Sequence, residues 1–321
     1  MASIRKSSVS NLPSYELTAG GYRAQVCAEL GGSCLQLTHL ATGAQLLRTP
    51  ATAEAALKSP FVYGTPFLFP PNRVLNGVYE FECRRYELPL NGDNGKTHLH
   101  GLIARSPFEV TALEADNDSA RIRMQFTADA EHPYISFPHD FRVVLTLTLD
   151  ETGLSHLIEI TNDSESNMPM GTGFHTTLNA PFMPDGKEED CVFSLGVGTE
   201  WLLGEMAIPT GEKRETSGIQ ESLRTEGIVP CAQKLSNLFV RTGPAVLKDK
   251  SSGRAIEYHS DSALKFWMIY NADSKQKFIC PEAQNWINTA ANRADWPAEE
   301  TGFMYLEPHK TFTARTRLCL K

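Results

Sequence analysis

The sequence alternates between apolar and polar side chains over ARIRMQF, residues 120–126. Successive side chains of a β-strand point to opposite faces, so this pattern predicts a strand with one buried and one solvated face. The same period of two recurs over residues 143–149, 154–160 and 312–320. We therefore expect β-strands to be the main type of secondary structure in this chain.

Five further stretches have the composition of strands, namely residues 22–29, 33–39, 108–113, 254–259 and 266–270. Turn-forming clusters such as Asp116-Asn117-Asp118 separate these runs, and only residues 52–58 are typical of a short helix. Many strands and few helices predict an all-β fold, a large antiparallel β-sandwich. No linker or fixed repeat divides the chain, so we expect one domain over residues 1–321.

Composition restricts the class of partner. The 321 residues carry a net charge of −8, which argues against nucleic acid or an anionic membrane as the main partner. Seven cysteines without C-x-x-C spacing predict reduced thiols, not disulfides or a zinc site. No signal peptide and no run of roughly 18 apolar residues is visible, so we expect a cytoplasmic protein.

Two titratable side chains end strand-like runs that are far apart in the sequence. His175 follows Gly171 and Gly173, where small residues allow another backbone or a ligand to approach closely. Glu282 follows the apolar segment Phe278–Pro281, and burial there would raise its pKa toward that of a useful base. Each residue taken alone is also compatible with a structural role.

A cation and two imidazoles occur in a third segment. Arg73 lies in an otherwise uncharged stretch from Phe61 to Val74, where a charge is usually paired or functional. His98 and His100 are two residues apart, so on a strand they would share a face. This spacing is compatible with metal binding, but no third ligand is evident, and we predict neither a metal site nor a nucleotide cofactor.

An ordered set of short motifs resembles the aldose 1-epimerase, or galactose mutarotase, family from about Tyr22 to the C-terminus. The set comprises Asn72-Arg73-Val74, Leu99-His100-Gly101, Gly173-Phe174-His175, Ile208-Pro209-Thr210-Gly211 and Glu282-Ala283-Gln284. The resemblance implies a sugar site on one sheet of the sandwich and no cofactor. It also implies that His175 is the catalytic acid, that Glu282 is the base, and that a small-molecule sugar is the substrate. The candidate substrate-binding residues are Arg73, His100, Asn72, His98, Gln284 and Asn237.

The sequence departs from the family in one part of the sugar site. The family commonly has an aspartate that binds sugar hydroxyls, whereas the nearest match here, Ser236–Val240, contains no acid. We therefore expect free glucose and galactose to be poor substrates and a substituted aldose or a disaccharide to be preferred. The oligomeric state expected is a monomer or a homodimer.

The implied reaction opens and recloses a sugar ring. A base removes the proton of the C1 hydroxyl while an acid protonates the ring oxygen, and the aldehyde then recloses on its other face. We expect His175 and Glu282 to be several ångströms apart, on either side of the ring.

Other functions remain open. A glycoside hydrolase would need a second carboxylate near Glu282, and Asp295 and Glu299 are nearby in the sequence. A non-catalytic carbohydrate-binding protein would keep Arg73 and His100 as sugar ligands. An epimerase of hexose 6-phosphates would need further basic residues, for which Arg293 is the only obvious local candidate.

Overall fold

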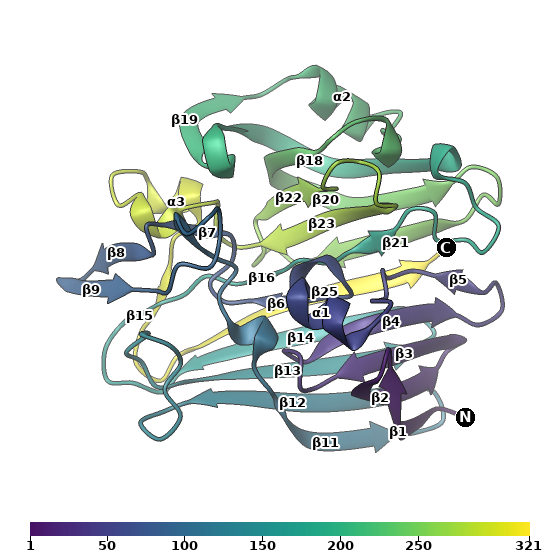
Figure 1. Cartoon of the computed structure of the whole chain (residues 1–321), viewed down its shortest axis with the longest axis horizontal. Helices are drawn as coiled ribbons and strands as arrows, with labels where there is room; N and C mark the ends of the chain where they lie inside the picture. Colours follow the sequence, from purple (N-terminus) through teal and green to yellow (C-terminus); the bar gives the residue numbers. More distant parts are fainter.

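The computed structural model describes all 321 residues, and most of its regular structure is antiparallel β-sheet (Figure 1). The largest sheet has 14 strands. Its main path runs through β11 (Glu109–Ala115), β12 (Ala120–Ala128), β13 (Phe141–Asp150), β14 (Gly153–Asn162), β25 (Thr311–Leu320), β21 (Ala255–Ser260), β20 (Ser236–Asp249), β22 (Phe266–Tyr270), β23 (Phe278–Gln284), β16 (Gly173–Phe174) and β6 (Phe67–Leu68). Three more strands join it at the side, namely β17 (Leu178–Asn179), β18 (Cys191–Leu203) and β19 (Pro209–Arg214).

The strands predicted from the period of two are confirmed. Residues 120–126 form most of β12, in which Ile122 and Met124 are fully buried whereas Arg121 and Arg123 are exposed. The three similar stretches lie in β13, β14 and β25, and the four strands pair in the order β12–β13–β14–β25. One face of this part of the sheet therefore carries buried apolar side chains, and the other face carries exposed charged side chains.

A second sheet covers the buried face. It consists of β1 (Ser3–Val9), β2 (Leu12–Ala19), β3 (Tyr22–Cys27), β4 (Ser33–His39) and β5 (Ala44–Gln45), paired in that order. Strand β2 contacts β12 and β13, strand β3 contacts β13, and the sheet lies in front of them in Figure 1. The main apolar core extends in sequence from Leu17 to Leu320, so residues near both ends of the chain contribute to it. These packed antiparallel sheets confirm the all-β prediction.

Short helices and small strand pairs complete the structure. The predicted helix is present as α1 (Ala53–Lys58), in which Oγ1 of the N-cap residue Thr52 accepts a hydrogen bond from the Ala55 amide. Two helices were not predicted, α2 (Gly218–Arg224) and α3 (Ala298–Thr301). None of the helices has the length and apolar character needed to span a lipid bilayer. The remaining strands pair as β7 (Arg73–Leu75) with β10 (Thr97–Leu99), β8 (Val78–Phe81) with β9 (Arg84–Glu87), and β15 (Met168–Pro169) with β24 (Tyr305–Leu306).

Candidate active site

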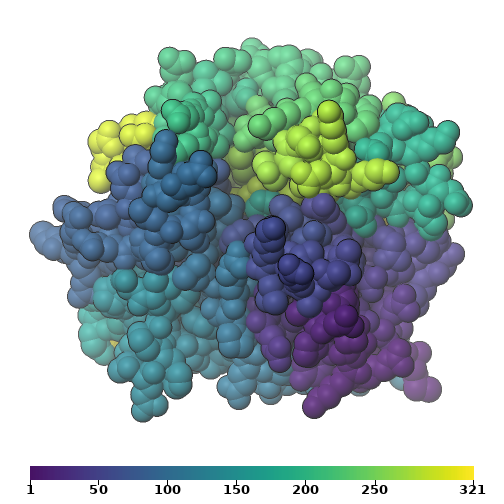
Figure 2. All heavy atoms as spheres, viewed as in Figure 1, coloured from purple at the N-terminus to yellow at the C-terminus, as the bar shows by residue number.

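A cleft of about 330 Å³ opens between segments near residues 58–105 and one end of the large sheet. One side of the cleft is built by the end of α1, by the 3₁₀-helices Pro60–Val62 and Ile103–Arg105, and by β7 and β10. The other side is built by β20, β22, β23 and the residue that follows β16. In Figure 2 the surface is hollowed near the centre, where blue, green and yellow-green segments meet.

His175 and Glu282 meet in this cleft. Strands β16 and β23 pair through Gly173 and Gln284, which brings the residue after β16 next to the carboxylate of β23. Nε2 of His175 lies 3.2 Å from Oε1 of Glu282, and the two residues are only 4% and 2% exposed. The expected separation of several ångströms is therefore wrong, because the two side chains are in direct contact.

Two glycines permit this close approach of the strands, as their positions in the sequence predicted. A Cβ atom on Gly173 would lie 2.5 Å from the carbonyl oxygen of Ala283 in β23. A Cβ atom on Gly171 would lie 2.3 Å from the ring of Trp286. Since real Cβ atoms do not approach other atoms so closely, larger residues here would push the two segments apart.

Burial shifts the two pKa values in opposite directions. It raises the pKa of Glu282 well above its usual value, although the charge of Arg73 and the hydrogen bond from Gln284 oppose this effect. The pKa of His175 is lowered to about 4, mainly by burial and also by the charge of Arg73, although a backbone hydrogen bond opposes this effect. The pair therefore takes up a second proton only in acid and loses its last proton only above the raised pKa of Glu282, so it holds one proton between these limits.

Gln284 positions Glu282 and does not itself line the cleft. Its Nε2 donates a hydrogen bond of 2.7 Å to Oε2 of Glu282, and its Oε1 accepts one from Nδ2 of Asn72. Asn72 does line the cleft, and its buried Oδ1 has no hydrogen-bond partner in the protein. This oxygen is an acceptor that a ligand hydroxyl could use.

His100 and Arg73 line the cleft beside the acid–base pair. The His100 ring stands edge-on to that of His175, with ring centroids 5.2 Å apart, and burial holds its pKa well below the usual value. Nε of Arg73 lies 2.8 Å from Oδ2 of Asp93 in a partly buried ion pair. Ligand atoms of His100, His175 and Glu282 lie within 4.8 Å of one another, so these three groups could hold a divalent ion such as zinc. Only His100 belongs to the pair of histidines seen in the sequence, and the other two ligands come from distant segments.

His98 does not share the cleft with His100, so the prediction of a common face is wrong. His98 is buried within β10, and its Nδ1 is 2.7 Å from the carbonyl oxygen of Pro89. His100 follows the strand with φ of 59°, in the left-handed region, so the alternation of a strand ends before it. Asn237 also points elsewhere, because its Nδ2 donates to Oε1 of Glu200 at 2.9 Å in a neighbouring cleft.

Several residues of the cleft were missed by the sequence analysis: Lys58, Phe61, Arg105, Met268 and Tyr270. Met268 and Tyr270 had a detectable signal. They are two positions apart in a predicted strand, so they share a face, and Met268 is paired with Glu282 across β22 and β23. Lys58 and Arg105 had no such signal, because each ends a short helical segment whose place in the fold depends on long-range packing.

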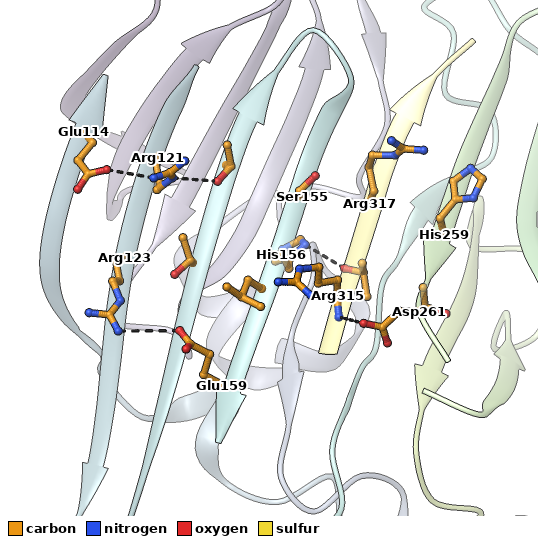
Figure 3. A pocket seen from close by; sticks show the side chains of 15 residues that line it. Glu114, Arg121, Arg123, Ser155, His156, Glu159, His259, Asp261, Arg315 and Arg317 are labelled. Atoms are coloured by element: carbon orange, nitrogen blue, oxygen red, sulfur yellow. Dashed lines mark hydrogen bonds and ion pairs between the residues drawn. The ribbon is translucent and has the colours of Figure 1, made fainter. Parts of the chain in front are cut away.

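A larger concavity, of about 780 Å³, lies on the outer face of the large sheet (Figure 3). Two of its arginines form ion pairs, Arg121 with Glu114 at 3.3 Å and Arg123 with Glu159 at 3.9 Å. Both ring nitrogens of His156 are engaged, with Thr65 at 3.3 Å and Thr316 at 3.2 Å. Because this histidine is engaged and contacts no carboxylate, the first cleft is the better candidate for acid–base chemistry.

Comparison with known proteins gives matches along nearly the whole chain. A sequence model described as aldose 1-epimerase matches residues 13–319. A galactose mutarotase-like protein from Clostridium acetobutylicum has a crystal structure that aligns with a TM-score of 0.95 at 26% identity, covering 100% of this chain and 98% of that one. Galactose 1-epimerase from Lactobacillus acidophilus NCFM aligns with a TM-score of 0.75 at 16% identity, covering 100% and 98%, and this likeness shows the fold alone.

A curated relative matches over a shorter region. The uncharacterized protein YihR of Escherichia coli (strain K12) is 28% identical over 195 residues. The match covers 60% of this chain and 58% of that protein, so it spans less than two thirds of either.

Proposed function

Because this chain belongs to the aldose 1-epimerase family, we propose that it interconverts the α and β anomers of a free aldose by acid–base catalysis at His175 and Glu282. The observation that carries the proposal is the 3.2 Å contact between Nε2 of His175 and Oε1 of Glu282 inside a cleft of about 330 Å³. A cleft of this size suits a small ligand.

The contact distance fits the geometry of the reacting atoms. Ring opening needs one proton transfer at the C1 hydroxyl and one at the ring oxygen, and both oxygens are bonded to C1. An acid and a base that touch each other can therefore serve both oxygens from one edge of the sugar. Each positioned acid or base contributes about 10²–10⁴ in rate.

One shared proton is enough for the whole cycle. The pKa shifts favour this proton on Glu282, and its transfer to His175 across the 3.2 Å contact gives a carboxylate and an imidazolium. In this form Glu282 takes the proton of the C1 hydroxyl while His175 protonates the ring oxygen. The open-chain aldehyde rotates about its C1–C2 bond, and both transfers then reverse. Arg73 stabilises the carboxylate, because its charge lowers the pKa of Glu282 against the effect of burial, and it makes His175 a stronger acid toward the ring oxygen, because it also lowers the pKa of His175.

The other cleft residues act as sugar ligands in this proposal. Arg73, His100 and Asn72 present donors and an unpartnered acceptor to the sugar hydroxyls. Gln284 orients the base by its hydrogen bond to Oε2. His98 and Asn237 lie outside the cleft lining and have no direct part in binding.

The alternatives fit the site less well. Most glycoside hydrolases use two carboxyl groups, but Glu282 is the only acidic residue that lines the cleft, and Asp295 and Glu299 are exposed elsewhere. A purely binding module has no need for a buried acid and base in contact, with pKa values shifted in opposite directions.

Optical rotation of freshly dissolved single anomers tests the proposal. We expect the protein to accelerate the approach to the same final rotation that the sugar reaches alone. Release of a new reducing end from a glycoside would instead assign the protein to the hydrolases. Sugar binding without any acceleration would assign it to the binding proteins.

A further inference from the structure

The cleft that contains His175 and Glu282 is lined by more basic than acidic side chains. Lys58, Arg73 and Arg105 line it, whereas Glu282 is its only acidic lining residue. The chain as a whole carries a net charge of −8. The excess of positive charge is therefore a local property of this cleft.

Two of the three cations have no acidic partner. Arg73 is paired with Asp93 at 2.8 Å, but neither Lys58 nor Arg105 forms an ion pair. Nη1 of Arg105 donates to the carbonyl oxygen of Leu57, the residue before Lys58, so both cations lie on the same wall. A guanidinium has five N–H donors, and most of those of Arg105 remain available to a ligand.

One aromatic ring lies near both Arg105 and the acid–base pair. Cζ of Arg105 lies 5.8 Å from the centroid of the Phe61 ring, which lies 6.5 Å from the centroid of the His175 ring. The guanidinium and His175 are therefore both neighbours of Phe61 in the same cleft. Ser236, Met268 and Tyr270, which the large sheet adds to the cleft, are uncharged and place no carboxylate there that would repel an anion.

From these contacts we infer that the substrate is an aldose with an anionic substituent, such as a phosphate, sulfonate or carboxylate group, away from C1. The inference rests on the function proposed above, because it places C1 at His175 and Glu282. Lys58 and Arg105 bind the anion by charge-assisted hydrogen bonds, which are about twice as strong as neutral ones. They take the role for which the sequence suggested Arg293, whose side chain instead lies 4.6 Å from the Trp296 ring, outside the cleft.

The test compares matched sugars by anomer-exchange NMR or polarimetry. The panel contains glucose, glucose 6-phosphate, 6-deoxy-6-sulfoglucose and glucuronate, measured with wild type, Lys58→Gln, Arg105→Gln and the double variant. Arg317→Gln is the control, because Arg317 is an exposed arginine of the outer concavity (Figure 3). Circular dichroism and the thermal unfolding midpoint report whether each variant is folded.

We expect at least one anionic sugar to have a kcat/KM tenfold or more above that of glucose. The double variant should raise KM for that sugar at least about tenfold, and this increase should be larger than any change in KM for glucose. The preferred sugar identifies the anion. Equal or better turnover of glucose than of every anionic sugar would overturn the inference but leave the proposed function intact. No acceleration with any sugar would overturn both.

Discussion

Gln284 holds Glu282 by a hydrogen bond of 2.7 Å from its Nε2 to Oε2 of the carboxylate. The two residues are two positions apart on β23 and share a face of the strand. Oε1 of Gln284 accepts a hydrogen bond from Nδ2 of Asn72, and the backbone N–H of Asn72 donates to Nδ1 of His100 at 3.3 Å. A continuous set of hydrogen bonds therefore links the proposed base to a proposed sugar ligand.

Replacing Gln284 by leucine should move the pH dependence of the reaction. The hydrogen bond from Gln284 lowers the pKa of Glu282, so its loss lets that pKa rise and shifts the alkaline limb of kcat/KM to higher pH. We also expect roughly a ten- to hundredfold loss of kcat, because a hydrogen bond to a charged group is worth about 1.5–3 kcal/mol. Gln276→Leu, at an exposed position, is the control. A lower kcat with an unmoved alkaline limb would contradict this role.

The wild-type protein should have a bell-shaped pH profile, because the proposed mechanism requires one proton on the His175–Glu282 pair. As the pH falls through about 4, His175 takes up a second proton for the pair and the rate declines. As the pH rises through the raised pKa of Glu282, the pair loses its only proton and the rate declines again. Measurement of kcat/KM from pH 3 to 10 would show both limbs; a rate that rises steadily into acid would be incompatible with this mechanism.

Glu282→Gln and His175→Asn each keep the shape of the side chain and remove its proton chemistry. Each should lower kcat by at least about a hundredfold, since one positioned acid or base contributes 10²–10⁴. The double variant should be little worse than either single variant, because the two residues act as one unit. Steady-state polarimetry measures all three, and wild-type turnover by either single variant would refute its assigned role.

Gly173→Ala should separate the two catalytic strands. The added Cβ would lie 2.5 Å from the Ala283 carbonyl, and overpacking of this kind costs about 1–3 kcal/mol of unfolding free energy. We expect a lower urea midpoint together with a loss of kcat, because His175 moves away from Glu282. Gly218→Ala is the matched control, since a Cβ there meets nothing within 4 Å. Equal stability and activity of both variants would show that the close approach at Gly173 is unimportant.

Much of the large sheet could be predicted because its strands alternate with a period of two and bury one face. Strands β18 and β20 were missed. They carry glycines where they pair, and a Cβ on Gly196 would lie 2.3 Å from Cα of Gly243, so their register is irregular and the alternation is weak. Helix α2 was also missed, although Ser217 caps it through the Gln220 amide at 3.2 Å, a recognisable Ser-x-x-Gln start. Its seven residues are too few for a clear helical period.

The candidate site was predictable only in part. The titratable ends of two apolar runs pointed to His175 and Glu282, and the structure brings both into one cleft. Their contact depends on the pairing of β16 with β23, which no local pattern encodes. His100 lines the cleft and His98 does not, because the backbone at His100 is left-handed and ends the alternation of the strand. This backbone conformation cannot be deduced from the spacing of the two histidines.

The most direct measurement of the central claim is anomer exchange at equilibrium, followed by NMR saturation transfer between the α and β C1 protons of each aldose tested. We expect the wild-type protein to raise the exchange rate in proportion to its concentration without changing the anomer ratio. Glu282→Gln should reduce this effect at least about a hundredfold. Exchange at the buffer rate with every neutral and anionic aldose, or equal exchange with wild type and Glu282→Gln, would contradict catalysis by the His175–Glu282 pair.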